Sequence, residues 1–226
     1  EEDDVIEDPE YLKWLSMLIA PGASLGGARP KASIVDSDGG LWIAKFPSLN
    51  DQGDIGGWEI VTYELAIASG INMAESKAQK FSSDYYTFLT KRFDRTNNDT
   101  RVHFASAMTM LGYTDGQDHS DGASYLDLVE FIQNHGANVD HDLEQLWRRI
   151  VFSICVTNTD DHLRNHGFIL TNGGWILSPA YDINPVETGT GLKLNISDED
   201  NSLNLDLALE VCEFFRLTEE QAKEII

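Results

Sequence analysis

The segment NTDDHLRNHGF, residues 158–168, gathers two carboxylates, two histidines, an arginine and two asparagines into eleven positions. Asp160 and Asn165 are five residues apart in this segment, and Asp182 follows later in the segment AYDIN. Phosphoryl transfer from a nucleotide requires a carboxylate that accepts the proton of the attacking hydroxyl group. It also requires an amide oxygen and a second carboxylate that bind Mg²⁺. Asp160, Asn165 and Asp182 could fill these three roles.

The elements on either side of this motif are expected to bring the three residues together. Apolar residues at helical spacing predict a helix over residues 140–155, which ends just before the motif. After the motif, the runs FIL and WILSPAYDI flank a Thr-Asn-Gly-Gly turn, which predicts a β-hairpin. Such a hairpin can fold Asp182 back beside Asn165.

The motif alone does not decide between catalysis and an ordinary turn. Asp, Asn and His between a helix and a hairpin are commonly caps and solvated turn residues. The protein-kinase catalytic loop has the same Asp-x-x-x-x-Asn interval. However, this chain lacks the usual His-Arg before Asp160 and the Phe-Gly after Asp182. The interpretation as a catalytic loop therefore depends on the motifs that precede it.

Three earlier features occur in the order expected of a site for nucleotide phosphates. Residues 22–31 are rich in glycine, which lets backbone N–H groups approach phosphate oxygens. Lys45 lies in the apolar strand LWIAKF, and a buried lysine needs an anionic partner. Glu59 is the predicted partner, with Glu64 as the alternative. A surface turn, an edge-strand lysine and a solvated helix face are the competing interpretations.

The pattern along the chain predicts an α+β fold in two lobes. Two apolar runs around an Asp-Gly turn, a helix over residues 58–69 and a strand over 86–94 form a strand-rich N-lobe, residues 1–95. The C-lobe, residues 96–226, is helical, and Ser124 begins one helix with a capping-box pattern. The aromatic residues expected in its core are Trp147, Trp175, Phe214 and Phe215.

Composition excludes several classes of protein. The chain has 16 basic and 38 acidic residues, a net charge of −22, which disfavours direct contact with nucleic acids or anionic membranes. Cys155 and Cys212 form no zinc or disulfide pattern, so a reducing cytoplasm fits best. The first residues, EEDDVIEDPE, do not resemble a signal peptide. The absence of an initiating Met favours a segment of a longer protein.

Five segments occur in a fixed order over about residues 20–190: GASLGGARPKA, WIAKFPS, KRFDR, NTDDHLRNHGF and AYDI. Together they resemble the HipA-type serine/threonine kinases of bacterial toxin–antitoxin systems. The resemblance implies a two-lobed, protein-kinase-like (HipA-like) fold, and transfer of the ATP γ-phosphate, with Mg²⁺, to a Ser or Thr of a protein. It also implies a HipB-like, DNA-binding antitoxin as partner, and aminoacyl-tRNA synthetases are known targets of the family.

The resemblance assigns roles to individual residues. Asp160 would be the catalytic base, and Lys45 and His162 would complete the catalytic set. Asn165 and Asp182 would bind Mg²⁺. The residues implied in ATP binding are Ser24, Gly26, Gly27, Ala28, Lys31, Lys45, Glu59, Lys91, Arg92, Phe93, Arg164 and Asn165. Among them, the backbone near Lys91 to Phe93 would receive the adenine, and Arg164 stands where a lysine is also common.

Ser24 matches the serine at which members of the family inhibit themselves by autophosphorylation. A phosphate there would add roughly 1.5 to 2 negative charges beside the phosphate-binding loop and repel ATP. The chain also departs from the family. The usual N-terminal subdomain before the Gly-rich loop and the helices after AYDI are shortened or absent in this sequence, which leaves target and antitoxin contacts open.

Three other functions remain as alternatives. A metal-dependent hydrolase could use the ligand-like set Asp160, Asp161, His162, His166 and Asp182. A catalytically inactive ATP-binding module would be expected to lack one of Lys45, Asp160, Asn165 or Asp182, and all four are present. A phosphotransferase of the same fold could act on a small molecule or lipid, because these motifs position ATP and say little about the acceptor.

Overall fold

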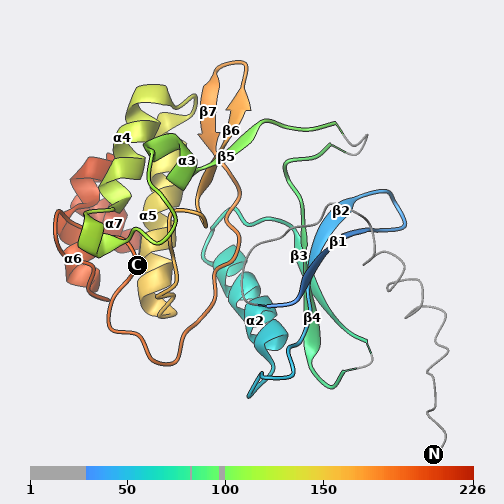
Figure 1. Ribbon diagram of the computed structural model, residues 1–226. Coiled ribbons are helices and arrows are strands. Elements are labelled where there is room, and N and C mark those ends of the chain that lie inside the picture. Colours follow the sequence, from blue (N-terminus) through green and yellow to red (C-terminus); the bar gives the residue numbers. More distant parts are fainter. Residues whose placement is uncertain (1–28, 82, 97–99) are drawn as a thin grey trace, which may run out of the picture. The chain divides into compact units, whose positions relative to one another are not determined.

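The computed structural model describes residues 29–81, 83–96 and 100–226 (Figure 1). The described chain divides into two compact units. Of the described residues, the first unit contains those in the ranges 29–60 and 75–101, and the second contains residues 61–74 and 102–226. The sequence places the boundary between lobes at residue 95, whereas this division places it at residue 101 and assigns the segment 61–74 to the second unit.

The first unit contains a four-stranded antiparallel sheet in the order β1-β2-β4-β3. Its strands are β1 (Lys31–Val35), β2 (Leu41–Lys45), β3 (Ser76–Lys80) and β4 (Tyr86–Lys91). The predicted hairpin is present as β1 and β2, with Ile34 opposite Trp42. Strand β3 was not predicted, because its sequence SKAQK has neither an apolar run nor an alternating apolar face.

Asp36 stabilises the turn between β1 and β2. Its Oδ1 accepts hydrogen bonds from the amides of Gly40, at 2.7 Å, and Asp38, at 3.0 Å, while Oδ2 accepts one from Nε1 of Trp42 at 2.7 Å. Burial opposes ionisation, but these hydrogen bonds lower the pKa of the Asp36 carboxyl below its ordinary value. Gly39 supplies the positive φ of 81° that the turn needs.

Helix α2 (Ile55–Ala68) begins three residues before the predicted start. Asp54 precedes it, and its Oδ1 accepts hydrogen bonds from the amides of Gly57 and Tyr86, each at 2.9 Å. One carboxylate therefore caps the helix and holds its first turn against β4. At the other end Gly70 has φ +76°, as expected of the predicted glycine stop.

Gly56 lies where α2 approaches β4 too closely for a side chain. A β-carbon on Gly56 would lie 2.1 Å from the carbonyl oxygen of Tyr86. Alanine normally stabilises a helix by up to about 1 kcal/mol over glycine. Here we expect Gly56→Ala to lower the free energy of unfolding by about 1–3 kcal/mol, because the backbone at Tyr86 or at the start of α2 must move to make room for the methyl group. Urea unfolding followed by circular dichroism measures this difference.

Gly53 offers a matched control, since a β-carbon there would meet no atom within 4 Å. Gly53→Ala is expected to change the free energy of unfolding by less than about 0.5 kcal/mol. Equal unfolding midpoints for the two variants would contradict the proposed close approach of α2 to β4.

The second unit is built around α4 (Tyr125–His135) and α5 (Val139–Cys155), which lie side by side in Figure 1. The predicted apolar face of α5 is buried in its main core; the residues are Leu143, Leu146, Trp147, Ile150, Val151 and Ile154. A three-stranded antiparallel sheet of β5 (Phe104–Ser106), β6 (Gly167–Thr171) and β7 (Gly174–Leu177) completes this arrangement. Strands β6 and β7 form the predicted second hairpin.

Short helices complete the second unit. They are α3 (Ala107–Leu111), the 3₁₀ helix η1 (His119–Asp121), α6 (Leu205–Glu210), the 3₁₀ helix η2 (Cys212–Phe215) and α7 (Glu219–Ile225). The predicted capping box of α4 is present, since Ser124 and Asp127 exchange hydrogen bonds with backbone amides. Phe215 is fully buried, whereas Phe214 is 55% exposed, so its predicted place in the core is wrong.

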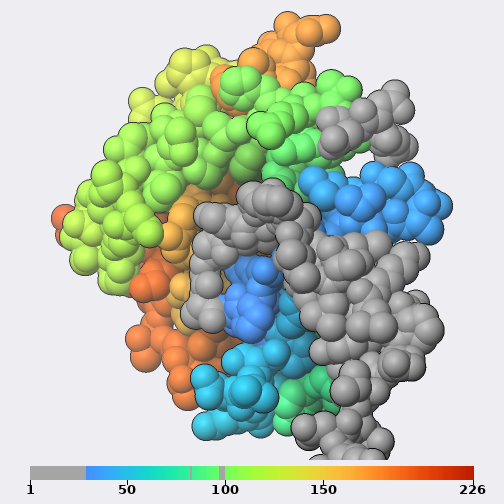
Figure 2. Space-filling view, turned by 45° about the vertical axis from the view of Figure 1, so that its right-hand side comes forward, coloured from blue at the N-terminus to red at the C-terminus, as the bar shows by residue number. Residues whose placement is uncertain are grey.

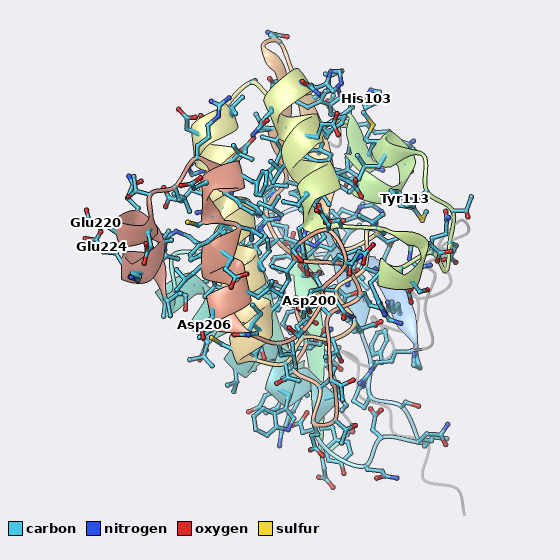
Figure 3. All side chains as sticks on the ribbon, turned by 90° about the vertical axis from the view of Figure 1, so that its left-hand side faces the viewer. His103, Tyr113, Asp200, Asp206, Glu220 and Glu224 are labelled. Atoms are coloured by element: carbon cyan, nitrogen blue, oxygen red, sulfur yellow. The ribbon has the colours of Figure 1, made fainter. Side chains whose placement is uncertain are left out.

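Many acidic side chains of the second unit point into solvent, including Asp200, Asp206, Glu220 and Glu224 in Figure 3. The charges of these exposed side chains are solvated and have no burial cost. Among the helices that the structure describes, none combines the length and the apolar character needed to cross a bilayer.

Candidate active site

The loop after α5 carries the motif that contains Asp160 and Asn165. Asn158, which is only 1% exposed, anchors this loop. Its amide donates to the Ser153 carbonyl at 2.8 Å, and its Oδ1 accepts from the amide of Asn184 at 3.4 Å. Thr157 has φ 55°, a strained value for a β-branched residue. Asn158 therefore links the end of α5 to the segment that follows Asp182.

Hydrogen bonds close the five-residue interval from Asp160 to Asn165 into a compact turn. The carbonyl oxygen of Asp160 accepts from the His162 amide at 2.9 Å and from Nδ2 of Asn165 at 3.2 Å. The amide of Asn165 donates to the His162 carbonyl at 2.8 Å. The Asp160 side chain itself is exposed. The turn thus fixes the base candidate and the amide ligand candidate relative to each other.

Asp182 follows β7 and belongs to the same part of the second unit. The hydroxyl group of its neighbour Tyr181 donates to the Arg164 carbonyl at 2.8 Å, so the residues that precede Asp182 and Asn165 are in contact. Asp182 has φ 58°, and its Oδ1 accepts from Nδ2 of Asn184 at 3.0 Å. Asn184 also donates its amide to Asn158, so a small network holds Asp182 in this conformation.

The chemistry of this donor set fits Mg²⁺. An amide oxygen from Asn165 and a carboxylate from Asp182 are hard oxygen ligands, and Mg²⁺ commonly takes one or two carboxylates while keeping several waters. Within the described ranges, no group of three or more His, Cys, Asp or Glu side chains is arranged to hold a metal ion. The site therefore fits a cation shared with phosphates better than an all-protein metal cage.

Asp161 and His166, two ligands of the alternative hydrolase set, face the core instead. Both side chains are almost fully buried, and Nε2 of His166 lies 2.9 Å from Oδ1 of Asp161. Oδ2 of Asp161 accepts from the Tyr125 hydroxyl group at 2.5 Å. Burial opposes ionisation, but His166 and Tyr125 hold the pKa of Asp161 below its ordinary value. The geometry therefore does not support the metal-dependent hydrolase.

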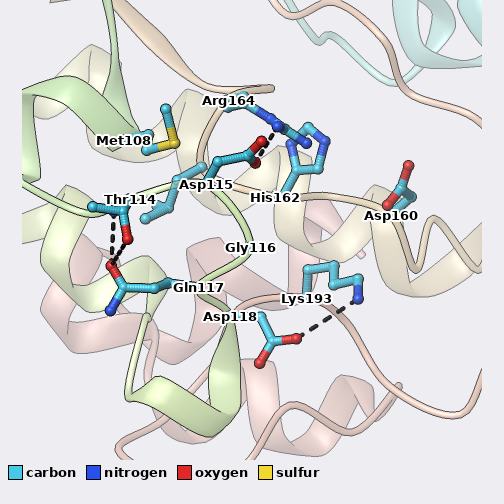
Figure 4. A pocket seen from close by; sticks show the side chains of 11 residues that line it. Met108, Thr114, Asp115, Gly116, Gln117, Asp118, Asp160, His162, Arg164 and Lys193 are labelled. Atoms are coloured by element: carbon cyan, nitrogen blue, oxygen red, sulfur yellow. Dashed lines mark hydrogen bonds and ion pairs between the residues drawn. The ribbon is translucent and has the colours of Figure 1, made fainter. Parts of the chain in front are cut away.

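A pocket of about 170 Å³ opens beside Asp160 within the second unit (Figure 4). Its lining includes Asp160, His162 and Arg164 of the turn and the residues 114–118 of a neighbouring loop. This loop belongs to the part of the chain that is coloured green in Figure 2, which forms a broad exposed surface in that view. Among these lining residues, Arg164 forms an ion pair with Asp115, and Nζ of Lys193 lies 3.7 Å from Oδ2 of Asp118.

In the first unit, Lys45 forms the predicted ion pair with Glu59. Both side chains are buried, at 8% and 5% exposure, whereas Glu64 is exposed. Lys31 lies directly opposite Lys45 in the register of β1 and β2, so both lysines share one face of the sheet. Nζ of Lys45 lies 5.4 Å from the ring centre of Phe88. Lys31 is therefore a second lysine beside the Lys45–Glu59 pair on this face of the sheet.

The segment Lys91–Phe93 begins at the last residue of β4. The Lys91 amide donates to the Glu75 carbonyl at 2.7 Å, and the Arg92 amide to the Leu41 carbonyl at 2.8 Å. The Arg92 guanidinium makes two hydrogen bonds with the Asp94 carboxylate. These two amides are therefore engaged in the first unit, and an adenine contact from Lys91 or Arg92 would have to use other groups. The remaining predicted ATP-binding residues, Ser24, Gly26, Gly27 and Ala28, lie outside the described residues.

Sequence reasoning missed a buried polar stripe along α5. Its members are Asp142, Gln145, Arg149 and Ser153, which are at most 7% exposed and recur at helical spacing. Arg149 donates from Nη2 to the Ser178 carbonyl at 2.6 Å, and burial lowers its pKa to about 10. The signal was available, because these polar residues border the apolar face of the predicted helix.

Comparisons with known proteins give a consistent result. The profile of the HipA-like C-terminal domain family matches residues 23–226. A protein of Haemophilus influenzae named "Putative kinase" is 26% identical over 183 residues, covering 71% of this chain and 52% of that protein. The chain thus spans about half the length of this curated relative.

Two solved structures have the same mixed α+β, kinase-like fold. The first, from Shewanella oneidensis, is that of the toxin–antitoxin proteins HipA and HipB with operator DNA. It matches with a TM-score of 0.75 at 20% identity, covering 96% of this chain and 60% of that chain. The second is the proinflammatory kinase CtkA of Helicobacter pylori, with a TM-score of 0.57 at 12% identity and 86% coverage of both chains.

Proposed function

This chain belongs to the HipA-like C-terminal domain family, and from this membership we propose that it is an ATP-dependent serine/threonine protein kinase of the cytoplasm. The observation that carries the proposal is the closed turn from Asp160 to Asn165, whose exposed carboxylate borders a pocket. Phosphoryl transfer depends mainly on positioning and charge stabilisation, and this turn supplies the positioning.

The nucleotide would be bound by residues of several motifs. Asn165 and Asp182 would hold Mg²⁺, which neutralises charge on the phosphates when bound. Lys45, kept in place by Glu59, would contact the α- and β-phosphates, and Lys31 would add positive charge on the same face of the sheet.

The acceptor hydroxyl group would approach Asp160 from the pocket. As the hydroxyl oxygen forms its bond to the γ-phosphorus, Asp160 accepts the hydroxyl proton, and the bond to the leaving ADP oxygen breaks. His162 and Arg164 border the same pocket and would orient the acceptor and the transferred group.

Autophosphorylation at Ser24 tests the proposal directly. We expect the purified protein to gain about 80 Da, one phosphoryl group, when incubated with ATP and Mg²⁺. Peptide mapping should place the group on Ser24, and Ser24→Ala should remove it. Removal of Mg²⁺ with a chelator should abolish the gain. Intact-mass spectrometry provides the measurement. An unchanged mass, with Mg-ATP binding retained, would support an inactive nucleotide-binding module instead.

The family and the net charge support a proposal for the biological role. We propose that the chain is part of a toxin with a HipB-like antitoxin, because HipA of Shewanella oneidensis was solved with HipB and operator DNA. A net charge of −22 favours association with DNA through such a DNA-binding partner over direct contact. The substrate would be a protein, and the resemblance suggests an aminoacyl-tRNA synthetase.

A further inference from the structure

Three buried side chains form a cluster behind the turn that carries Asp160 and Asn165. Nε2 of His166 lies 2.9 Å from Oδ1 of Asp161. The hydroxyl group of Tyr125, in α4, donates a hydrogen bond to Oδ2 of Asp161 at 2.5 Å. The rings of Tyr125 and His166 also meet edge to face, with centres 5.8 Å apart. We call Tyr125, Asp161 and His166 the clasp.

The position of the clasp in the sequence gives it a specific effect on the turn. Asp161 directly follows the base candidate, Asp160, and His166 directly follows the amide ligand candidate, Asn165. The Asp161–His166 contact therefore ties together the two ends of the turn, on the core side of the backbone. On the other side of the same backbone, the Asp160 carboxylate is exposed and borders the pocket.

Tyr125 anchors this contact to the body of the second unit. Each carboxylate oxygen of Asp161 has its own partner, Oδ1 with His166 and Oδ2 with Tyr125. Tyr125 is fully buried at the start of α4, and its amide donates to the Asn195 carbonyl at 3.0 Å. The carbonyl of His166 accepts from the Ala107 amide at 2.8 Å, which fixes the far end of the turn to α3.

We propose that the clasp positions Asp160 and Asn165 for phosphoryl transfer, an inference that rests on the proposed kinase function. Its three residues touch neither substrate nor nucleotide, and they act through the backbone of the turn. Apolar side chains could fill the same space without loss of stability. The distinctive contribution of a buried set held by one hydrogen bond and one close polar contact is therefore a fixed geometry.

Tyr125→Phe tests the clasp by removing one hydroxyl group. We expect the rate constant of autophosphorylation at saturating Mg-ATP to fall by about 10- to 100-fold, as when partners of functional ligands are removed. The ATP concentration that gives half of the maximal rate should stay unchanged. The Mg²⁺ concentration that gives half of the maximal rate should rise. Thermal unfolding confirms that the assay is run on folded protein.

Tyr113→Phe is the matched control. The Tyr113 hydroxyl group donates to Oδ2 of Asp127 at 3.0 Å, and burial beside this carboxylate raises its pKa to about 12. Like Tyr125, it is a tyrosine whose hydroxyl group donates a hydrogen bond to a carboxylate, but this carboxylate belongs to α4 and not to the turn. Removing the Tyr113 hydroxyl group should leave the rate constant of autophosphorylation unchanged. An equal loss of rate in both variants would mean that only general stability was affected, and would overturn the proposal.

Asp161 variants add a graded test. Asp161→Asn keeps the shape but has one carbonyl oxygen for two partners, so its loss of rate should be smaller than that of Asp161→Ala. Hydrogen exchange of the His162 and Asn165 amides gives a readout independent of activity. Both amides should exchange faster in Tyr125→Phe than in Tyr113→Phe.

These measurements separate the clasp from the proposed function. A wild-type protein that transfers no phosphoryl group would refute the kinase proposal, while the exchange of the turn amides would still decide whether the clasp orders the turn. Unchanged exchange and unchanged rate in folded Tyr125→Phe and Asp161→Asn would refute the clasp alone.

Discussion

Replacing Asp160 with asparagine is expected to lower the rate of phosphoryl transfer by roughly 10²- to 10⁴-fold, the usual contribution of a general base. Asparagine keeps the size of the side chain but cannot accept the proton of the acceptor hydroxyl group. Incorporation of phosphate from labelled ATP, measured under single-turnover conditions, gives the rate. Mg-ATP binding should be retained, because Asn165 and Asp182 are unchanged.

The location of Asp160 makes this experiment easy to interpret. Its side chain is exposed, and only its backbone carbonyl takes part in the hydrogen bonds that close the turn. Asp160→Asn should therefore change the free energy of unfolding by less than about 0.5 kcal/mol. A variant that kept more than a tenth of the wild-type rate would exclude Asp160 as the base. A larger loss of stability would instead indicate an unrecognised structural role.

Breaking the Lys45–Glu59 ion pair is expected to lower both the stability of the protein and the rate of phosphoryl transfer. Lys45→Ala leaves the buried Glu59 carboxylate without its partner, and removing one member of a buried pair typically costs about 3–5 kcal/mol of stability. The same variant should lose most phosphoryl transfer, since Lys45 is proposed to contact the phosphates. Urea unfolding and the phosphate-incorporation assay measure the two effects.

A double variant distinguishes the structural effect from the catalytic one. Lys45→Met together with Glu59→Leu replaces the ion pair with apolar side chains of similar volume, which is commonly neutral or stabilising. We expect the double variant to regain most of the stability and none of the activity. Recovery of activity together with stability would show that Lys45 serves only the fold of the first unit.

The sequence predicted best what depends on regular spacing. The apolar face of α5, the capping box at Ser124 and both hairpins follow from periodicity and turn residues, and all are present. The pairing of Lys45 with Glu59 was also predictable, because a lysine in an apolar strand requires a nearby carboxylate. These features depend on the periodicity and turn residues of short segments, or on the high cost of burying an unpaired charge.

Other features depended on the tertiary fold and could not be read from local patterns. Strand β3 has a polar sequence and exists because it pairs with β4. Phe214 and Phe215 fall in a 3₁₀ turn, so only one of two adjacent aromatics can face the core. Asp161 was interpreted as a loop residue, yet it is buried beside Tyr125, 36 residues earlier in the chain.

The polar stripe of α5 has a consequence for how the chain selects its fold. Asp142 accepts the amide of Leu177, Gln145 contacts the backbone of Asn72 and Gly70, Arg149 contacts the Ser178 carbonyl, and Ser153 accepts from Asn158. A helix with only apolar contacts could shift or rotate against its neighbours at a small cost in free energy, because such contacts are not directional. This helix cannot, because any shift would strand several polar groups at once without hydrogen-bond partners. The polar stripe thus specifies a single register and rotation of α5 against the three segments around it.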